Sequence, residues 1–472
     1  MDYSSGSESM SLMVSISGIR GVVGESLTPE VIVKYARSFA QYSNRGAIVI
    51  GRDGRVSGKI VGNIVASTLL AAGCDVVALG IVPTPTIGIA VEQLGAAGGI
   101  SVTASHNPIE WNGLKFIGAD GMFLDGDANS RLWKIAETPG SYAHWNELGE
   151  HTTNDSFIER HIGLVLHLPF FDADLIRRRK FKVVADCVHG AGGRIVPQLL
   201  RELGCDVVEL NCDCSGLFSR NPEPVPENLV ELRRRVTAEQ ADCGIAVDPD
   251  ADRLALVDEK GEAFGEELTV TTAVRFILEK LGSKRGPAGA GGKPTVVVNL
   301  STTRAVDDVA RKFGAEVVRT PVGEINVAKK MKELGAVVGG EGSGGVILPV
   351  VHYTRDAIAG IGLIMQQLAE FGGTLSAFKA TMPRYSMVKT KVSVENRDPD
   401  SVLKAIRKEH AKNGNVNTDD GLKLSFDDSW VHLRRSNTEP IIRIIAEAPT
   451  SRKAEELSER FGGLLRTAKD RA

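Results

Sequence analysis

One serine, Ser105, stands where chemistry can occur. It lies in a polar turn, residues 103–108, directly after the apolar segment 98–102, which we expect to be a buried strand. Asn107 and Pro108 end regular structure in this turn. Open α/β sheets place reacting groups at the carboxyl ends of their strands, so Ser105 is a candidate nucleophile. A turn that only caps the next segment is the alternative, and three other segments weigh against it.

Three carboxylates, Asp248, Asp250 and Asp252, occupy alternate positions after another apolar strand segment, residues 242–247. Negative charges this close repel one another, so they need a cation or strong hydrogen-bond donors. Hard oxygen ligands suit Mg²⁺, which also leaves room for a phosphate oxygen. An EF-hand loop is disfavoured because its sixth position is Arg253, where a glycine is required. We predict a metal site, with an acidic surface turn as the alternative.

A third polar segment, residues 434–440, follows the strand-like residues 430–433. Arginine matches phosphate with two parallel hydrogen bonds, and hydroxyl, amide and backbone N–H groups complete an anion site. A capping turn beside surface arginines explains the segment equally well when it is taken alone. The candidate phosphate-binding residues are Arg434, Ser436, Asn437, Thr438 and Arg443.

A glycine-rich loop, residues 341–345, carries one carboxylate, Glu341, and one hydroxyl, Ser343. It matches neither the Walker loop nor the dinucleotide fingerprint. A carboxylate on a loop with little side-chain bulk is suited to binding neighbouring hydroxyls of a sugar. A mobile turn is the equal alternative.

Several cations surround these segments in the sequence. Arg20 stands between glycines, and residues 51–55 repeat that pattern after a strand. In one cleft with Ser105, these arginines would neutralise a phosphoserine of roughly -1.5 to -2 charges. Lys115 follows the serine turn and is a candidate for proton transfer, although an exposed lysine is the simpler interpretation.

The elements that position these residues form an internal repeat. A helical segment ending in glycine and followed by a β-branched strand occurs three times, at Gly73, Gly204 and Gly314. The next strand leads to the serine turn in the first copy, to the three aspartates in the second and to the glycine-rich loop in the third. We therefore expect an α/β fold of three related α/β domains with mixed sheets, plus a C-terminal α+β domain. The expected boundaries are 12–150, 155–262, 263–380 and 385–472.

Composition limits the classes of partner. A chain of 472 residues is too long for one hydrophobic core. The net charge of -3 argues against attraction to nucleic acid or membranes. Six cysteines are too few for a disulfide framework, and residues 1–11 lack the pattern of a signal peptide. No apolar run approaches membrane-spanning length, so we expect a cytoplasmic protein.

Together and in this order, these motifs resemble the α-D-phosphohexomutase family of phosphoglucomutases, phosphomannomutases and phosphoglucosamine mutases. The resemblance extends from Ser17 to Arg443. It implies four domains in a heart-shaped arrangement around one central cleft. It also implies interconversion of hexose 1-phosphate and 6-phosphate by two phosphoryl transfers, through a phosphoserine and a sugar 1,6-bisphosphate. The protein would be a monomer or a homodimer.

The resemblance also assigns roles to residues. Ser105 would carry the phosphoryl group, and the three aspartates would hold one Mg²⁺ together with a phosphoserine oxygen. Arg20 and Arg253 would face the transferring phosphoryl group, and Lys115 or His106 would assist proton transfer. By the same resemblance, Glu341, Ser343 and the turn containing Gly323 would bind the sugar hydroxyls. The non-reacting phosphate would bind at Arg434, Ser436, Asn437, Thr438 and Arg443.

The chain departs from the family at Gly345. Many bacterial members end the sugar loop with histidine there, whereas this loop is closer to the archaeal type. The loop therefore does not decide between glucose, mannose and glucosamine phosphates. Two other functions remain open at this point: a phosphoserine-dependent sugar-phosphate phosphatase and a non-catalytic sugar-phosphate-binding protein.

Overall fold

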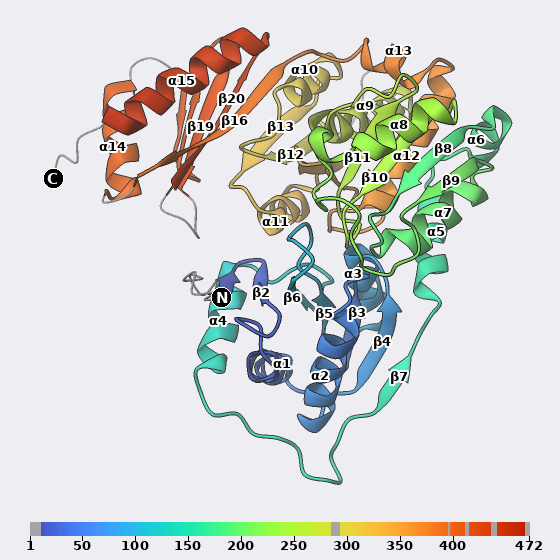
Figure 1. Cartoon of the computed structure of the whole chain (residues 1–472), viewed down its shortest axis with the longest axis vertical. Helices are drawn as coiled ribbons and strands as arrows, with labels where there is room; N and C mark the ends of the chain where they lie inside the picture. The colour runs from blue at the N-terminus through green and yellow to red at the C-terminus, as the bar shows by residue number, and fades with distance from the viewer. Residues whose placement is uncertain (1–10, 285–292, 395–396, 411–414, 436–440, 468–472) are drawn as a thin grey trace, which may run out of the picture. The chain divides into compact units, whose positions relative to one another are not determined.

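The chain folds into two compact units. Figure 1 labels the helices and strands and colours them from the N-terminus to the C-terminus. Unit 1 comprises Met1–Phe276 and Ser343–Ala380, and unit 2 comprises Ile277–Gly342 and Thr381–Ala472. Among the helices with described positions, none is long and apolar enough to cross a membrane. The computed structural model describes residues 11–284, 293–394, 397–410, 415–435 and 441–467.

The first sheet of unit 1 has seven strands in the order β1-β2-β6-β5-β3-β4-β7. Strand β3 pairs in parallel with β4 and β5, and β6 runs antiparallel to β5. The strands are β1 (Met13–Ser15), β2 (Gly18–Val22), β3 (Ile48–Arg52), β4 (Val76–Ile81), β5 (Gly98–Val102), β6 (Trp111–Gly118) and β7 (His151–Thr153). The helices of this part are α1 (Pro29–Tyr42), α2 (Gly58–Ala71), α3 (Thr84–Leu94) and α4 (Gly126–Ala136).

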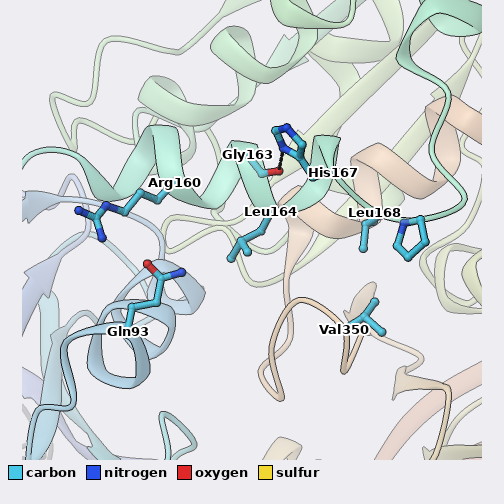
Figure 2. Close-up of a pocket in the computed structure, with 8 residues that line it drawn as sticks. Gln93, Arg160, Gly163, Leu164, His167, Leu168 and Val350 are labelled. Carbon is cyan, nitrogen blue, oxygen red and sulfur yellow. Dashed lines mark hydrogen bonds between the residues drawn. The ribbon is translucent and has the colours of Figure 1, made fainter.

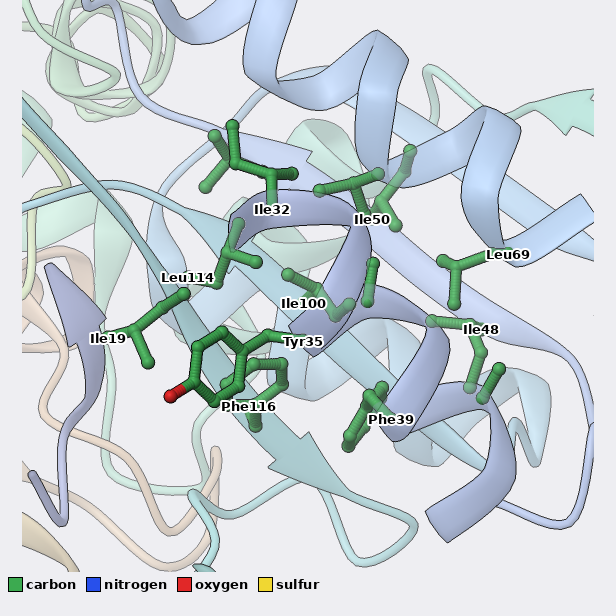
Figure 3. Packing of buried hydrophobic residues seen from close by; sticks show 14 of the residues in the cluster. Ile19, Ile32, Tyr35, Phe39, Ile48, Ile50, Leu69, Ile100, Leu114 and Phe116 are labelled. Carbon is green, nitrogen blue, oxygen red and sulfur yellow. The ribbon is translucent and has the colours of Figure 1, made fainter. Parts of the chain in front are cut away.

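Aromatic and branched aliphatic side chains fill the core between this sheet and helices α1 and α2 (Figure 3). Phe39 of α1 lies 5.1 Å from Phe116 of β6, measured between ring centroids. Two glycines in β5 allow this close packing. A Cβ on Gly98 would lie 2.8 Å from the Phe39 ring, and one on Gly99 would lie 2.8 Å from Val91 of α3. Strand β5, which leads to Ser105, is therefore clamped between helices on both faces.

The second sheet of unit 1 has the order β11-β10-β8-β9, with β10 parallel to β8 and antiparallel to β11. Its strands are β8 (Lys182–Asp186), β9 (Asp206–Leu210), β10 (Cys243–Val247) and β11 (Leu254–Asp258). The surrounding helices are α5 (Phe157–Leu166), α6 (Ala173–Arg179), α7 (Gly192–Glu202), η1 (Pro226–Asn228) and α8 (Val230–Ala238). Later in the chain, β15 (Gly345–Ile347), α12 (Ala357–Phe371) and α13 (Leu375–Lys379) complete the unit, and α9 (Glu266–Lys284) crosses the division between the units.

Unit 2 contains strands β13, β12 and β14 side by side in that order and an antiparallel sheet of order β16-β20-β19-β18-β17. The first group comprises β12 (Thr295–Asn299), β13 (Glu316–Thr320) and β14 (Val338–Glu341), with helices α10 (Ala305–Lys312) and α11 (Glu324–Leu334). The second comprises β16 (Ser386–Ser393), β17 (Asn415–Asn417), β18 (Leu422–Ser425), β19 (Trp430–Arg435) and β20 (Ile441–Ala448). Helices α14 (Pro399–His410) and α15 (Ser451–Thr467) accompany that sheet.

The internal repeat predicted from the sequence is confirmed. Gly73, Gly204 and Gly314 have φ values of 84°, 73° and 65°, so each occupies the left-handed region between a helix and the next strand. In every copy that next strand, β4, β9 or β13, pairs in parallel with the central strand β3, β8 or β12. The central strand pairs in turn with β5, β10 or β14. The mixed α/β class and the α+β character of the C-terminal part are as expected.

Candidate active site

Ser105 lies in the turn after β5 with a backbone φ of 49°, in the left-handed region. The side chain is almost fully buried, with 2% of its surface exposed. Its hydroxyl Oγ donates to Oδ2 of Asp248 at 2.9 Å. His106 Nδ1 lies 3.3 Å from Ser105 Oγ. The structure thus brings the first and second predicted segments together within unit 1.

Arg55 holds the serine turn in place through hydrogen bonds to its backbone. Its guanidinium is fully buried and pairs with Asp53 through Nε, at 3.2 Å from Oδ2. The remaining donors go to backbone carbonyls and not to the serine hydroxyl. Arg55 therefore organises the turn, which differs from the phosphate contact expected for the 51–55 segment. The accepting carbonyls belong to Ser105 (2.7 Å), Asn107 (2.6 Å), Pro108 (2.5 Å) and Trp111 (2.8 Å).

The three aspartates stand in the short turn between β10 and β11, completely buried, with their carboxylate oxygens within 4.8 Å of one another. One oxygen of each is fixed by protein donors. Asp248 Oδ1 accepts from the backbone N–H groups of Asp252 (3.1 Å) and Arg253 (3.2 Å). Asp250 Oδ2 accepts from Thr84 Oγ1 at 2.8 Å and from Lys115 Nζ at 2.6 Å. Asp252 Oδ2 accepts from Arg355 Nη2 at 2.6 Å.

The second oxygen of each aspartate accepts none of the hydrogen bonds just described. Oδ1 of Asp250 and Oδ1 of Asp252 are buried and have no hydrogen-bond partner within the described part of the chain. The remaining oxygen of Asp248 accepts the Ser105 hydroxyl. Buried polar atoms without partners are costly, and three converging carboxylates supply the hard oxygen ligands that Mg²⁺ prefers. The residues present therefore fit a divalent cation.

Burial and mutual repulsion shape the charge of this cluster. Burial, followed by the charges of Asp252 and Asp250, raises the pKa of Asp248 well above its usual range. Burial alone would also raise the pKa of Asp252, but the charges of Arg355, Lys115 and Arg253 together outweigh burial, and the pKa is lowered. A bound divalent cation adds a further positive charge that favours the ionised carboxylates.

Arg20, Arg253 and His106 also lie in this part of unit 1. Arg20 Nη1 donates to the side-chain oxygen of Asn107 at 3.1 Å, and Arg253 Nη1 lies 3.4 Å from Glu223 Oε1. The charge of Arg253, together with burial and the charge of Arg20, lowers the pKa of His106 well below its usual range. His106 is therefore neutral near pH 7 and can accept a proton.

In unit 2, Glu341 ends β14 and is buried. Its Oε1 accepts hydrogen bonds from Asn299 Nδ2 at 2.7 Å and from the Gly323 backbone N–H at 3.0 Å. The predicted carboxylate and the predicted turn are thus in direct contact. Ser343 is the first residue of the second segment of unit 1 and is half-buried.

Arg434 is oriented by a residue that sequence reasoning missed. Its Nε lies 2.8 Å from Oδ2 of Asp420, which also accepts the backbone N–H of Val322 at 2.9 Å. Asp420 therefore connects the arginine to the turn containing Gly323. Arg443 of β20 pairs in register with Arg434 of β19. Ser436, Asn437 and Thr438 lie outside the described residues.

Sequence reasoning also missed Thr84 and Arg355, although each had a signal. Thr84 is the first residue of α3 and lies in a Pro-Thr-Pro-Thr segment shortly after β4, and polar residues just after strands were the pattern that led to Ser105. Arg355 precedes Asp356, whose side chain caps the buried helix α12. An arginine next to a helix cap is a weak signal without the structure.

A separate cavity of about 650 Å³ in unit 1 contains none of the predicted site residues (Figure 2). One wall is helix α5, where His167 Nδ1 lies 2.7 Å from the Gly163 carbonyl. Gln93 and Val350 complete its rim. The three aspartates do not line this cavity, so the candidate active site remains the aspartate cluster.

The comparisons with known proteins identify the family of the chain. Four family models match in order: phosphoglucomutase/phosphomannomutase α/β/α domains I, II and III at residues 13–143, 159–261 and 270–385, and the C-terminal domain at 390–462. The chain belongs to the phosphoglucomutase/phosphomannomutase family. Its members are phosphohexomutases, so the protein is an isomerase of the mutase type.

Individual relatives cover almost the entire chain. The "Probable phosphoglucosamine mutase" of Methanopyrus kandleri is 38% identical over 95% of this chain and 97% of its own. The "Phosphoglucomutase/phosphomannomutase" of Thermococcus kodakarensis is 38% identical over 94% and 96%. A crystal structure of a phosphoglucomutase/phosphomannomutase family protein from Burkholderia thailandensis superposes with a TM-score of 0.83 at 27% identity, covering 98% of this chain and 99% of that one.

Proposed function

We propose that the protein interconverts hexose 1-phosphates and 6-phosphates through a phosphoserine at Ser105 and a bisphosphorylated sugar. The observation that carries this proposal is the buried contact between Ser105 Oγ and Asp248, beside two carboxylate oxygens that accept no hydrogen bond within the described residues. A hydroxyl in that position, once phosphorylated, places its phosphate oxygens beside a cation site. Positioning and charge neutralisation supply most of the catalysis in phosphoryl transfer.

In the first transfer, the bond between phosphorus and Ser105 Oγ breaks as a sugar hydroxyl oxygen bonds to phosphorus. The hydroxyl proton passes to His106, or to Lys115 in its neutral form, and Ser105 Oγ takes up a proton as it leaves phosphorus. The second transfer reverses these changes at the other phosphate, which regenerates the phosphoserine. Arg20 and Arg253 would stabilise the charge on the transferring group. Mg²⁺, held by Asp248, Asp250 and Asp252, would supply Lewis-acid polarisation when bound.

The remaining predicted residues would recognise the rest of the substrate. Glu341 and the turn at Gly323 would bind sugar hydroxyls, together with Ser343. The non-reacting phosphate would bind to Arg434, Ser436, Asn437, Thr438 and Arg443. We propose the domain boundaries 12–150, 155–262, 263–380 and 385–472, with these tasks divided in the order phosphoserine, metal, sugar and second phosphate.

The test is to incubate the protein with Mg²⁺, a trace of hexose 1,6-bisphosphate and a hexose 1-phosphate. We expect formation of the 6-phosphate without release of inorganic phosphate, and a fall in kcat of about 10³-fold or more in Ser105→Ala. Release of phosphate without 6-phosphate would establish the phosphatase alternative instead. Full activity of the Ser105→Ala variant would show that the phosphoserine is misplaced.

A comparison of substrates in the same assay identifies the preferred sugar. The relatives named above divide between phosphoglucosamine mutase and phosphoglucomutase/phosphomannomutase. We propose that glucosamine, glucose and mannose phosphates are the candidate substrates. Comparing kcat/KM for the 1-phosphates of glucose, mannose, glucosamine and N-acetylglucosamine ranks them directly.

A further inference from the structure

We propose that Arg355 is a positioning residue of the aspartate cluster and that the glycine at position 345 exists to make room for it. Arg355 would orient Asp252 so that its second oxygen stays available to a divalent cation. This inference rests on the proposed use of the aspartates as a metal site. It assigns a role to two residues that the phosphoserine chemistry described above does not use.

The contact between Arg355 and Asp252 is short and buried. Arg355 Nη2 donates to Asp252 Oδ2 at 2.6 Å, with the arginine side chain 10% exposed and the carboxylate fully buried. Asp252 Oδ1 is the oxygen that has no hydrogen-bond partner among the described residues. Arg355 therefore does for Asp252 what Thr84 and Lys115 do for Asp250. A hydrogen-bonded carboxylate keeps one orientation, which is how outer contacts tune metal affinity.

The stem of Arg355 fills the space beside Gly345. A Cβ built on Gly345 would lie 2.9 Å from Arg355 Cγ, 3.2 Å from Nε and still closer to Cδ. Gly345 belongs to β15, and its φ is not in the left-handed region, so the backbone does not require glycine. The requirement is steric. Because the guanidinium is tethered to Asp252, the stem cannot move aside without breaking that contact.

The residue that follows Arg355, Asp356, is held by several hydrogen bonds. The Asp356 N–H donates to the Val346 carbonyl at 2.8 Å, and Asp356 Oδ1 accepts from the first N–H groups of α12. Its other oxygen lies 2.8 Å from Nε2 of His161, whose Nδ1 lies 2.9 Å from Thr86 Oγ1. Arg355 thus extends from a well-ordered backbone. Its guanidinium is therefore directed at Asp252 before any ligand binds.

No side chain at position 345 can coexist with this conformation of Arg355. A side chain at 345 and the stem of Arg355 would compete for the same space. The glycine and the arginine therefore form a pair, and the sugar-loop departure seen in the sequence becomes a feature of the metal site.

Mn²⁺ binding tests the proposal without any sugar or turnover. Electron paramagnetic resonance titration of the unphosphorylated full chain would measure the Mn²⁺ Kd. We expect R355A to weaken binding by about 10-fold or more and R355K to restore part of it. The matched control is R177A, which removes an exposed ion pair with Asp174 in the same unit. Unchanged or tighter Mn²⁺ binding by R355A overturns the proposal, and so does failure of the parent protein to bind Mn²⁺.

A double-mutant cycle tests the pairing with Gly345. G345A should weaken Mn²⁺ binding in the parent, because the added Cβ displaces Arg355, and should have no further effect in R355A. An equal effect of G345A in both backgrounds would show that the two residues act independently and overturns the steric part. The cycle also separates this inference from the proposed function. Loss of sugar-phosphate interconversion with Mn²⁺ binding intact would reject the mutase proposal and leave Arg355 in its role.

Discussion

At the scale of single residues, the site depends on buried charged side chains. Their hydrogen-bond partners are backbone groups or one oxygen of a carboxylate. Arg55 shows this most clearly, since one guanidinium donates to three carbonyls of the serine turn, to the carbonyl of Trp111 and to one carboxylate. Such an arginine cannot be replaced by a lysine, which offers a compact ammonium without the planar fork. The conformation of the turn is therefore set from within the protein.

The substitution Arg55→Lys tests this dependence. It should lower the free energy of unfolding by about 3–5 kcal/mol, because it leaves buried carbonyls and the Asp53 carboxylate without adequate donors. Urea unfolding of the parent and the variant gives the difference. Arg52→Lys is the control, since Arg52 lies three residues earlier and is only half-buried. A loss below about 1 kcal/mol in Arg55→Lys would mean that the turn holds its shape without the fork.

Residue types and strand ends were enough to predict Ser105 and the three aspartates. The partners that orient them were not predictable in the same way. Arg355 and Thr84 reach their aspartates from segments more than a hundred residues distant in sequence, and only the folded chain brings them together. The segment 51–55 was expected near Ser105, but the sequence does not show whether a guanidinium such as that of Arg55 contacts a phosphate or backbone carbonyls.

At the scale of elements, strand β19 carries a buried histidine that responds to pH. His432 Nε2 lies 2.6 Å from the Asp420 carbonyl, and Nδ1 lies 2.9 Å from Ser301 Oγ. These contacts suit a neutral ring that donates from Nε2 and accepts at Nδ1. Burial, only partly offset by its contact with Asp420, lowers the pKa of His432 to about 4. Asp420 also holds Arg434, so protonation here reaches the predicted phosphate site.

Acid should therefore weaken unit 2 through His432. The pKa in the folded state is below the unfolded value of about 6.5, so the unfolded chain binds the proton first. The stability contribution is complete above about pH 6.5 and is lost as the pH falls toward 4, by up to about 3 kcal/mol. Denaturant unfolding of unit 2 between pH 4 and 8 measures the loss. His432→Gln should flatten that part of the curve, and an unchanged slope in the variant would assign the pH dependence to other groups.

Sequence periodicity predicted the repeated helix–glycine–strand elements because each one is local. Long-range packing was less visible. Helix α12 is buried along almost its whole length, and its Gly362 lies against Val165 of α5 in unit 1. A helix that is apolar on all faces does not show which neighbours cover it. The sequence therefore could not predict that residues 343–380 join the first unit in the structure.

At the scale of the whole molecule, the aspartate cluster lies entirely within unit 1. A ligand stabilises the part of a protein whose folded state it binds, by about 2.7 kcal/mol at a hundred times its Kd. Saturating Mg²⁺ should therefore slow hydrogen exchange in peptides from β10 and β11, while peptides from β13 and β19 of unit 2 exchange as before.

Hydrogen exchange followed by mass spectrometry makes this comparison in a single sample. The control is Asp250→Asn, which keeps the fold of the turn and removes one ligand charge. Protection of β10 that persists in the variant, or protection spread equally over both units, would be inconsistent with a site made by these carboxylates alone.

The left-handed backbone of Ser105 has a practical consequence for anyone who wants an inert form of the protein. Alanine is the usual replacement for a reactive serine, but it keeps the Cβ that makes a φ of 49° unfavourable, by about 1–2 kcal/mol. Glycine removes the hydroxyl and the Cβ together. Ser105→Gly should therefore melt at a higher temperature than Ser105→Ala, and a stability screen blind to activity would favour glycine at the residue on which turnover depends.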